Sequence, residues 1–144
     1  MTTAMHSVSV AAVIVDDTGR ALLIKRRDND HWEPPGGVLE LDEDITTGLR
    51  REAREETGLN VEPVALTGVY KNMKRSVIAL VFRCKATGGE LTLNDEVSAF
   101  QWARPDEVAE LVDEAFAVRV TDALADLESP AVRQHDGKHV TPEL

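Results

Sequence analysis

Three glutamates, Glu52, Glu55 and Glu56, lie close together in a segment whose pattern predicts a helix. At about 100° per residue, Glu52 and Glu56 are about 40° apart around the helix axis, and Glu55 is about 60° from Glu52. Like charges at this spacing repel, and the helix dipole disfavours anions near the C-terminal end. Mg²⁺ takes such carboxylate oxygens together with water and substrate phosphates, so the pattern indicates a metal site. A surface helix of ion pairs, with Arg51 pairing to Glu55, is the alternative.

The glutamates belong to a longer pattern with fixed spacing. The segment from Gly37 to Leu59 reads GVLELDEDITTGLRREAREETGL. This segment resembles the Nudix box at every fixed position of that motif. Asp42 stands where the family usually has glycine, and Ala53 stands where it prefers a larger aliphatic residue. These departures affect the expected loop conformation and the helix packing, while every acidic position of the motif is present.

The resemblance implies a hydrolase that cleaves a phosphoanhydride bond in a nucleoside diphosphate linked to another moiety, such as a (d)NTP or a nucleotide sugar. The implied cofactor is Mg²⁺, with Mn²⁺ as a possible substitute. Glu52, Glu55 and Glu56 are the implied catalytic metal ligands, and Arg51 is a further residue of the catalytic box. Arg51 and Glu43 are expected to form ion pairs that hold the loop and the helix rigid.

A further acid is expected outside the box. Nudix enzymes commonly recruit an acidic residue from a later loop as a metal ligand or general base. Glu96 precedes Trp102 at a spacing similar to that in mutator-type Nudix triphosphatases, and Asp95 is the second candidate. An ordinary acidic surface loop is the alternative for both. The resemblance leaves the base open between Glu52 and the later acid.

Four residues are expected to bind substrate: Arg27, Trp32, Gly36 and Gly37. The family often uses an arginine near Arg26 and Arg27 to hold a substrate phosphate, and Arg27 aligns better. Trp32 could stack on a base, with a packing role as the alternative. Gly36 and Gly37 end a Pro-Pro-Gly-Gly turn, in which glycine lets the backbone approach the site closely.

Two other functions are alternatives to the Nudix hydrolase. A catalytically inactive Nudix-fold regulator that binds a nucleotide would be marked by degenerate box carboxylates, and here they are all present. An isopentenyl-diphosphate-isomerase-like enzyme would need a reactive cysteine, whereas Cys84 lies in an apolar stretch that predicts a buried strand. The subfamily is not identified. The proline of ADP-ribose pyrophosphatases is absent near Arg75 and Ser76, and Tyr70 comes too early for diadenosine-polyphosphate hydrolases.

The elements that must position these residues follow from hydrophobic patterning. A helix is expected over 44–57 with Gly58 as its cap, and Gly48 inside it indicates either tolerance or close packing. Residues 16–19 predict the turn of a hairpin, and 87–90 predict another turn. Strands are expected at 7–15, 20–27, 61–70, 76–86 and 99–103, and two later helices are expected, one of which begins at Pro105. The expected class is α/β (α+β), a Nudix-type α/β/α sandwich with a mixed central sheet.

Length and charge set the remaining expectations. The 144 residues fit a single domain, with an ordered core at about 6–127 and a polar tail, open to a lid role, at 128–144. The net charge of −10 disfavours a nucleic-acid polymer as partner and suits a small nucleotide that arrives with a divalent cation. No leader or membrane span is apparent, so a cytoplasmic protein is expected. The family resemblance also allows a homodimer.

Overall fold

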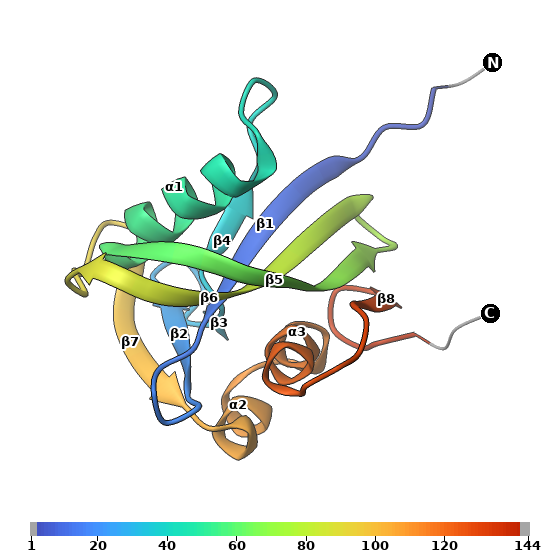
Figure 1. Ribbon diagram of the computed structural model, residues 1–144. Coiled ribbons are helices and arrows are strands. Elements are labelled where there is room, and N and C mark those ends of the chain that lie inside the picture. The colour runs from blue at the N-terminus through green and yellow to red at the C-terminus, as the bar shows by residue number, and fades with distance from the viewer. Residues whose placement is uncertain (1–2, 142–144) are drawn as a thin grey trace.

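Two sheets form the frame of the protein (Figure 1). The computed structural model describes residues 3–141. One sheet has five strands in the order β4-β1-β6-β5-β8, and the other has three in the order β3-β2-β7. The elements are β1 (Ser7–Ile14), β2 (Ala21–Arg26), β3 (Trp32–Glu33), β4 (Gly36–Val38), α1 (Ile45–Thr57), β5 (Leu59–Asn72), β6 (Val77–Gly89), β7 (Val97–Ala103), α2 (Pro105–Leu111), α3 (Glu114–Leu124) and β8 (Ala131–His135).

The five-stranded sheet is mixed and lies between helices. β1 runs parallel to β6 and β5 runs parallel to β8, whereas the β1–β4 and β5–β6 pairs are antiparallel. In Figure 1, α1 lies on one side of this sheet, and α2 and α3 lie on the other. The expected α/β/α sandwich with a mixed central sheet is therefore confirmed.

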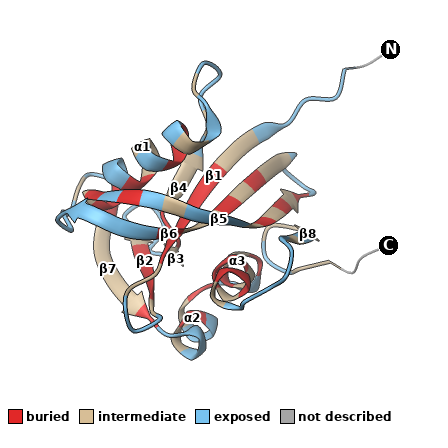
Figure 2. Ribbon diagram, in the orientation of Figure 1, coloured by how far each residue is buried: buried red, intermediate tan, exposed pale blue. Residues whose placement is uncertain are grey.

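β1 is buried on both of its faces. Val10 and Ile14 belong to a core that includes Leu49 of α1, whereas Ala11 and Val13 belong to a second core beneath α2 and α3. Successive side chains of a strand point to opposite faces, so one apolar run can serve both cores. Figure 2 shows the buried positions along β1 and on α3.

Two local predictions about strand pairing were wrong. β1 and β2 do not form a hairpin: they belong to different sheets and are linked by the isolated bridge between Val15 and Ala21. Residues 87–89 of the expected turn at 87–90 are instead a continuation of β6, in which Gly89 pairs with Leu59. A Cβ atom on Gly89 would overlap the Gly58 carbonyl oxygen, so the glycine there permits a close approach of two backbones.

The expected irregular tail was wrong for residues 131–135, which form β8 parallel to β5. Arg133 donates to both carboxylate oxygens of Asp122 at 2.8 Å, and the Tyr70 hydroxyl donates to Asp122 at 2.7 Å. His135 is buried. Ladder hydrogen bonds and a buried ion pair hold this strand, and neither requires the apolar periodicity by which strands are recognised in a sequence. Residues 142–144 lie outside the described part of the chain.

Candidate active site

Helix α1 carries the acidic residues of the site, and its ends are fixed by local interactions. The side chain of Asp44 accepts a hydrogen bond from the Thr47 amide at the N-terminus, and Gly58 closes the C-terminus in the left-handed conformation. A Cβ atom on Gly48 would lie 2.8 Å from a carboxylate oxygen of Glu43 and would overlap Leu39. Gly48 therefore serves close packing of the preceding loop on the helix.

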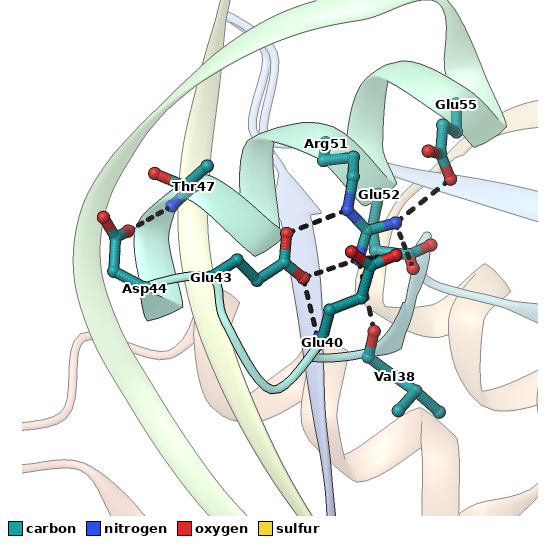
Figure 3. Close-up of polar contacts among 8 residues, drawn as sticks. All are labelled: Val38, Glu40, Glu43, Asp44, Thr47, Arg51, Glu52 and Glu55. Atoms are coloured by element: carbon teal, nitrogen blue, oxygen red, sulfur yellow. Dashed lines mark hydrogen bonds and ion pairs between the residues drawn. The ribbon is translucent and has the colours of Figure 1, made fainter.

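Arg51 ties that loop to the helix (Figure 3). Its guanidinium donates to both oxygens of Glu43, at 3.0 and 2.6 Å, and to the Val38 carbonyl at 3.3 Å. It also donates to Glu52 at 3.0 Å and to Glu55 at 3.2 Å. The hydrogen bonds from Arg51 lower the pKa of Glu43 to about 2, and the bonds to Glu43 raise the pKa of Arg51. The pair expected between Arg51 and Glu43 is therefore present and stays charged at neutral pH.

Glu56 faces inward and has the opposite electrostatic environment. Its side chain accepts a hydrogen bond of 2.6 Å from the Gly36 amide, and the residue is 7% exposed. Burial raises the pKa of Glu56 to about 8, and repulsion from Glu52 and Glu33 adds to the shift. Burial also raises the pKa of Glu52. The two glutamates thus form a desolvated acidic cluster, which a cation would stabilise.

Gly36 and Gly37 were expected to end a turn, but they begin strand β4. They come close to this cluster because they lack side chains. A Cβ atom on Gly37 would lie 2.5 Å from the Glu52 carboxylate carbon. Gly36 and Gly37 pair with Ala11 and Val10 of β1, which fixes their position beside the helix. Any larger residue at 37 would displace the Glu52 carboxylate.

A cavity of about 610 Å³ opens over the acidic cluster, and we call it the acid cavity. It brings together most of the residues that the sequence indicates for the site, drawn from α1, from β4, from the end of β2 and from the loop before β7. Its lining consists of Arg26, Arg27, Asp28, Glu33, Gly36, Gly37, Glu52, Glu56, Asp95 and Glu96.

Glu55 and Glu33 are placed differently from expectation. Glu55 does not line the acid cavity, because its carboxylate is 56% exposed and pairs with Arg51 on the outer side of the helix. Glu33, which sequence reasoning missed, lines the cavity and forms an ion pair of 3.3 Å with Arg26. Burial raises the pKa of Glu33. Its position directly before the Pro-Pro-Gly-Gly turn is the one sequence signal that could have indicated it.

Asn94 is a second residue that sequence reasoning missed, and it positions the loop that carries the later acids. Its side-chain amide donates to the Glu56 carbonyl at 2.9 Å, and its side-chain oxygen accepts from the Glu96 amide at 2.9 Å. The Arg27 guanidinium donates to the Asn94 carbonyl at 2.8 Å. The end of α1, the loop with Asp95 and Glu96, and the end of β2 are thus joined through one side chain and its backbone.

Trp32 lies outside the acid cavity. It lines a neighbouring hollow of about 490 Å³ together with His31, Arg75 and Phe116. Cys84 is buried in the core beneath α1, where burial raises the pKa of its thiol to about 12. A thiol in that environment is not a nucleophile at neutral pH, which argues against the isomerase alternative.

The donor chemistry of the acid cavity suits a hard divalent cation. Among residues 3–141, no three histidine, cysteine, aspartate or glutamate side chains converge as a ready ligand set. A carboxylate oxygen of Glu52 accepts a hydrogen bond from Arg51, and one of Glu56 accepts from the Gly36 amide. The protein itself thus supplies a donor to each of these two like-charged groups. The donors are nevertheless all oxygens, and within the described chain no basic side chain pairs with Glu56. This combination fits Mg²⁺ or a similar ion.

Comparisons of the chain with a family model and with known proteins indicate the same family. The NUDIX domain model matches residues 5–124. The chain is 56% identical over 138 residues to a MutT-like protein of Streptomyces ambofaciens, covering 96% of this chain and 89% of that protein. It is 30% identical over 144 residues to nucleoside triphosphatase NudI of Salmonella agona, covering 85% and 99%.

A solved structure supports the fold alone. An ADP-ribose pyrophosphatase from Streptococcus suis is similar with a TM-score of 0.77 at 20% identity, covering 89% of this chain and 99% of that one. In the part of the chain that the structure describes, each helix is too short or too polar to cross a membrane.

Proposed function

Because the chain belongs to the NUDIX domain family, we propose that it hydrolyses a phosphoanhydride bond in a nucleoside diphosphate linked to another moiety, with Mg²⁺ as cofactor. Its class is that of the Nudix pyrophosphohydrolases. The relative named nucleoside triphosphatase favours a (d)NTP as substrate, and nucleotide sugars are the further candidates. The observation that carries the proposal is the acid cavity, in which desolvated carboxylates meet the glycine backbone of β4.

The proposed metal ligands are Glu52, Glu56 and Glu96, all of which line the acid cavity. Glu55, whose carboxylate pairs with Arg51 in this structure, is the fourth proposed ligand. When bound, the cation would neutralise the phosphates, activate a water molecule and stabilise the leaving phosphate.

The chain's own residues supply positioning and proton transfer. Either Glu52 or Glu96 accepts the proton of the attacking water, since both carboxylates face the acid cavity. Arg27 lies in the same lining and is positioned to hold a substrate phosphate. Gly36 and Gly37 bring the backbone against the substrate without side-chain obstruction. Arg51 and Glu43 are positioning residues that hold the loop and the helix together.

The proposal is tested with Glu56→Gln, measured by phosphate and pyrophosphate release from a panel of (d)NTPs and nucleotide sugars in Mg²⁺ and in Mn²⁺. We expect turnover to fall at least about 100-fold with the fold intact, since a metal-binding charge is lost. Glu62→Gln is the matched control, because Glu62 is exposed on β5 and pairs with Arg50. Near-normal turnover by Glu56→Gln would overturn the assignment.

A further inference from the structure

Arg119 on α3 is a buried cation that no carboxylate pairs with in residues 3–141. It is 8% exposed, and its Nε–H has no hydrogen-bond partner. One terminal nitrogen lies 3.2 Å from Nε2 of His135, and the guanidinium carbon lies 4.6 Å from the centre of the Phe116 ring. Burial lowers the pKa of Arg119 to about 10. Glu33 attracts this charge from beyond ion-pair distance. Keeping the cation in this position still costs stability, because its lost hydration is not replaced by a directly paired anion.

Arg119 lines a second cavity of about 360 Å³ that adjoins the acid cavity. Arg26, Glu33, Gly36 and Gly37 line both cavities. A substrate with its phosphates over the acidic cluster could therefore extend its other moiety past the glycines of β4 and reach Arg119. This step rests on the proposed function.

The remaining lining of the second cavity selects the kind of moiety. Its lining includes the apolar residues Val10, Val38, Val77, Ala79 and Phe116, together with the polar residues Ser9, Asn72 and Arg75. A nucleobase fits them, because it has apolar faces and a polar edge, and ligand pockets typically combine apolar walls with a few polar groups.

The hydrogen-bond donors of Arg119 determine which groups of a base can face it. A guanidinium carries only hydrogen-bond donors, so it needs acceptors opposite it. Guanine and thymine present a carbonyl oxygen where adenine and cytosine present an amino group. A donor facing an amino group would leave both groups unsatisfied.

We infer that Arg119 is a specificity-determining residue that donates to a nucleobase carbonyl, so that the enzyme prefers keto bases over amino bases. Glu33 lines the same cavity and supplies an acceptor for the N–H groups that keto bases carry beside the carbonyl. The test examines purine and pyrimidine nucleotides separately.

The test compares kcat/KM for dITP with dATP and for dUTP with dCTP, because within each pair the bases differ at the keto or amino position. We expect the wild-type enzyme to favour the keto member of at least one pair by about tenfold. Arg119→Met, which retains packing on Phe116 but removes the donors, should bring that ratio close to one. Arg119→Lys, which retains a donor, should keep part of the preference.

Arg83→Met is the matched control, because Arg83 contacts α3 through the Ala123 carbonyl and lines neither cavity. It should leave the keto preference unchanged. Calorimetric binding of dIMP and dAMP gives a second readout that does not depend on turnover. An Arg119→Met enzyme with the wild-type preference, or a wild-type enzyme without keto preference in either readout, would overturn the inference. A wild-type enzyme that cleaves no nucleotide or nucleotide sugar would defeat the proposed function, and the binding ratio would still decide the role of Arg119.

Discussion

Glu43 and Glu56 are the same residue type in one motif, and their surroundings give them opposite acidities. Glu43 accepts two hydrogen bonds from Arg51, which lower its pKa to about 2. Glu56 is buried against the Gly36 amide, and burial raises its pKa to about 8. Glu43 therefore acts as a permanent anion that holds Arg51, whereas Glu56 is an acid that a cation would ionise.

Glu43→Gln should impair the proposed metal site from a distance. The amide cannot pair with the Arg51 charge, so Arg51 is free to compete more strongly for the Glu52 carboxylate. We expect kcat/KM to fall about 10–100-fold, and the Mg²⁺ concentration for half-maximal activity to rise. The measurement is a Mg²⁺ titration of activity, with Asp42→Asn in the same loop as control. An unchanged Mg²⁺ dependence would show that Glu43 does not position the site.

At this scale the sequence predicts some contacts and misses others. Helical spacing is enough to expect that Arg51 reaches Glu55, and the motif indicates the Arg51–Glu43 pair. Glu33 and Asn94 were missed because they lie at the ends of chain segments whose paths depend on tertiary packing. The angular positions of side chains around a helix also do not show which carboxylate will pair with a neighbouring arginine and point outward, as Glu55 does.

At the scale of elements, α1 and the loop before it behave as one packed unit. Gly48 allows Leu39 and Glu43 to lie against the helix, and Arg51 holds Glu43 there by two hydrogen bonds. The helix gives up about 1 kcal/mol of intrinsic stability by having glycine at this position. The absence of a side chain at this position allows the loop to pack close to the helix.

Gly48→Ala should therefore lower stability, although alanine is the better helix former. Overpacking costs roughly 1–3 kcal/mol, and Glu43 cannot move aside without leaving Arg51. We expect a lower melting temperature in thermal unfolding followed by circular dichroism. Gly88→Ala is the control, since a Cβ atom there meets nothing nearer than Asn60 at 3.6 Å. A Gly48→Ala protein that melts higher than the wild type would contradict the packing role.

Elements defined by local interactions were predicted well, and those defined by distant partners were not. The span of α1 and its Gly58 cap follow from short-range pattern and cap chemistry. β2 pairs with β3 and with β7, which is far along the chain, and not with β1, so the turn at 16–19 suggested a hairpin that does not form. β8 was missed for the same reason, because its partner β5 and its anchor Asp122 are distant in sequence.

At the scale of the whole molecule, the C-terminal segment adds an edge strand to the larger sheet, beside β5. Asp122 on α3 binds Tyr70 on β5 and Arg133 on β8, so one carboxylate joins three elements. His135 follows at the end of β8, where its Nδ1 accepts from the Gly137 amide at 2.9 Å. Its other ring nitrogen faces Arg119. The imidazole is thus surrounded by hydrogen-bond donors.

His135 should make the protein less stable in mild acid. Burial lowers its pKa, Arg119 lowers it further, and Asp136 opposes the shift. The unfolded chain, in which histidine has a pKa of about 6.5, therefore takes up a proton before the folded protein does, so stability falls as the pH drops below about 6.5. The measurement is the free energy of unfolding in urea between pH 8 and pH 5. The difference between wild type and His135→Gln should shrink as the pH falls.

His139→Gln is the control for this titration, because the His139 side chain is 63% exposed. It should follow the pH dependence of the wild-type protein. Parallel curves for wild type and His135→Gln would show that His135 does not contribute to the acid sensitivity.

The two buried faces of β1 have a consequence for how this protein can change over generations. The residues from Val10 to Ile14 are each at most 6% exposed, so a replacement at any of them changes the packing of one core or the other. Mutational libraries spread along this strand should yield mostly inactive clones. Tolerance should concentrate at the exposed residues of α2 and α3.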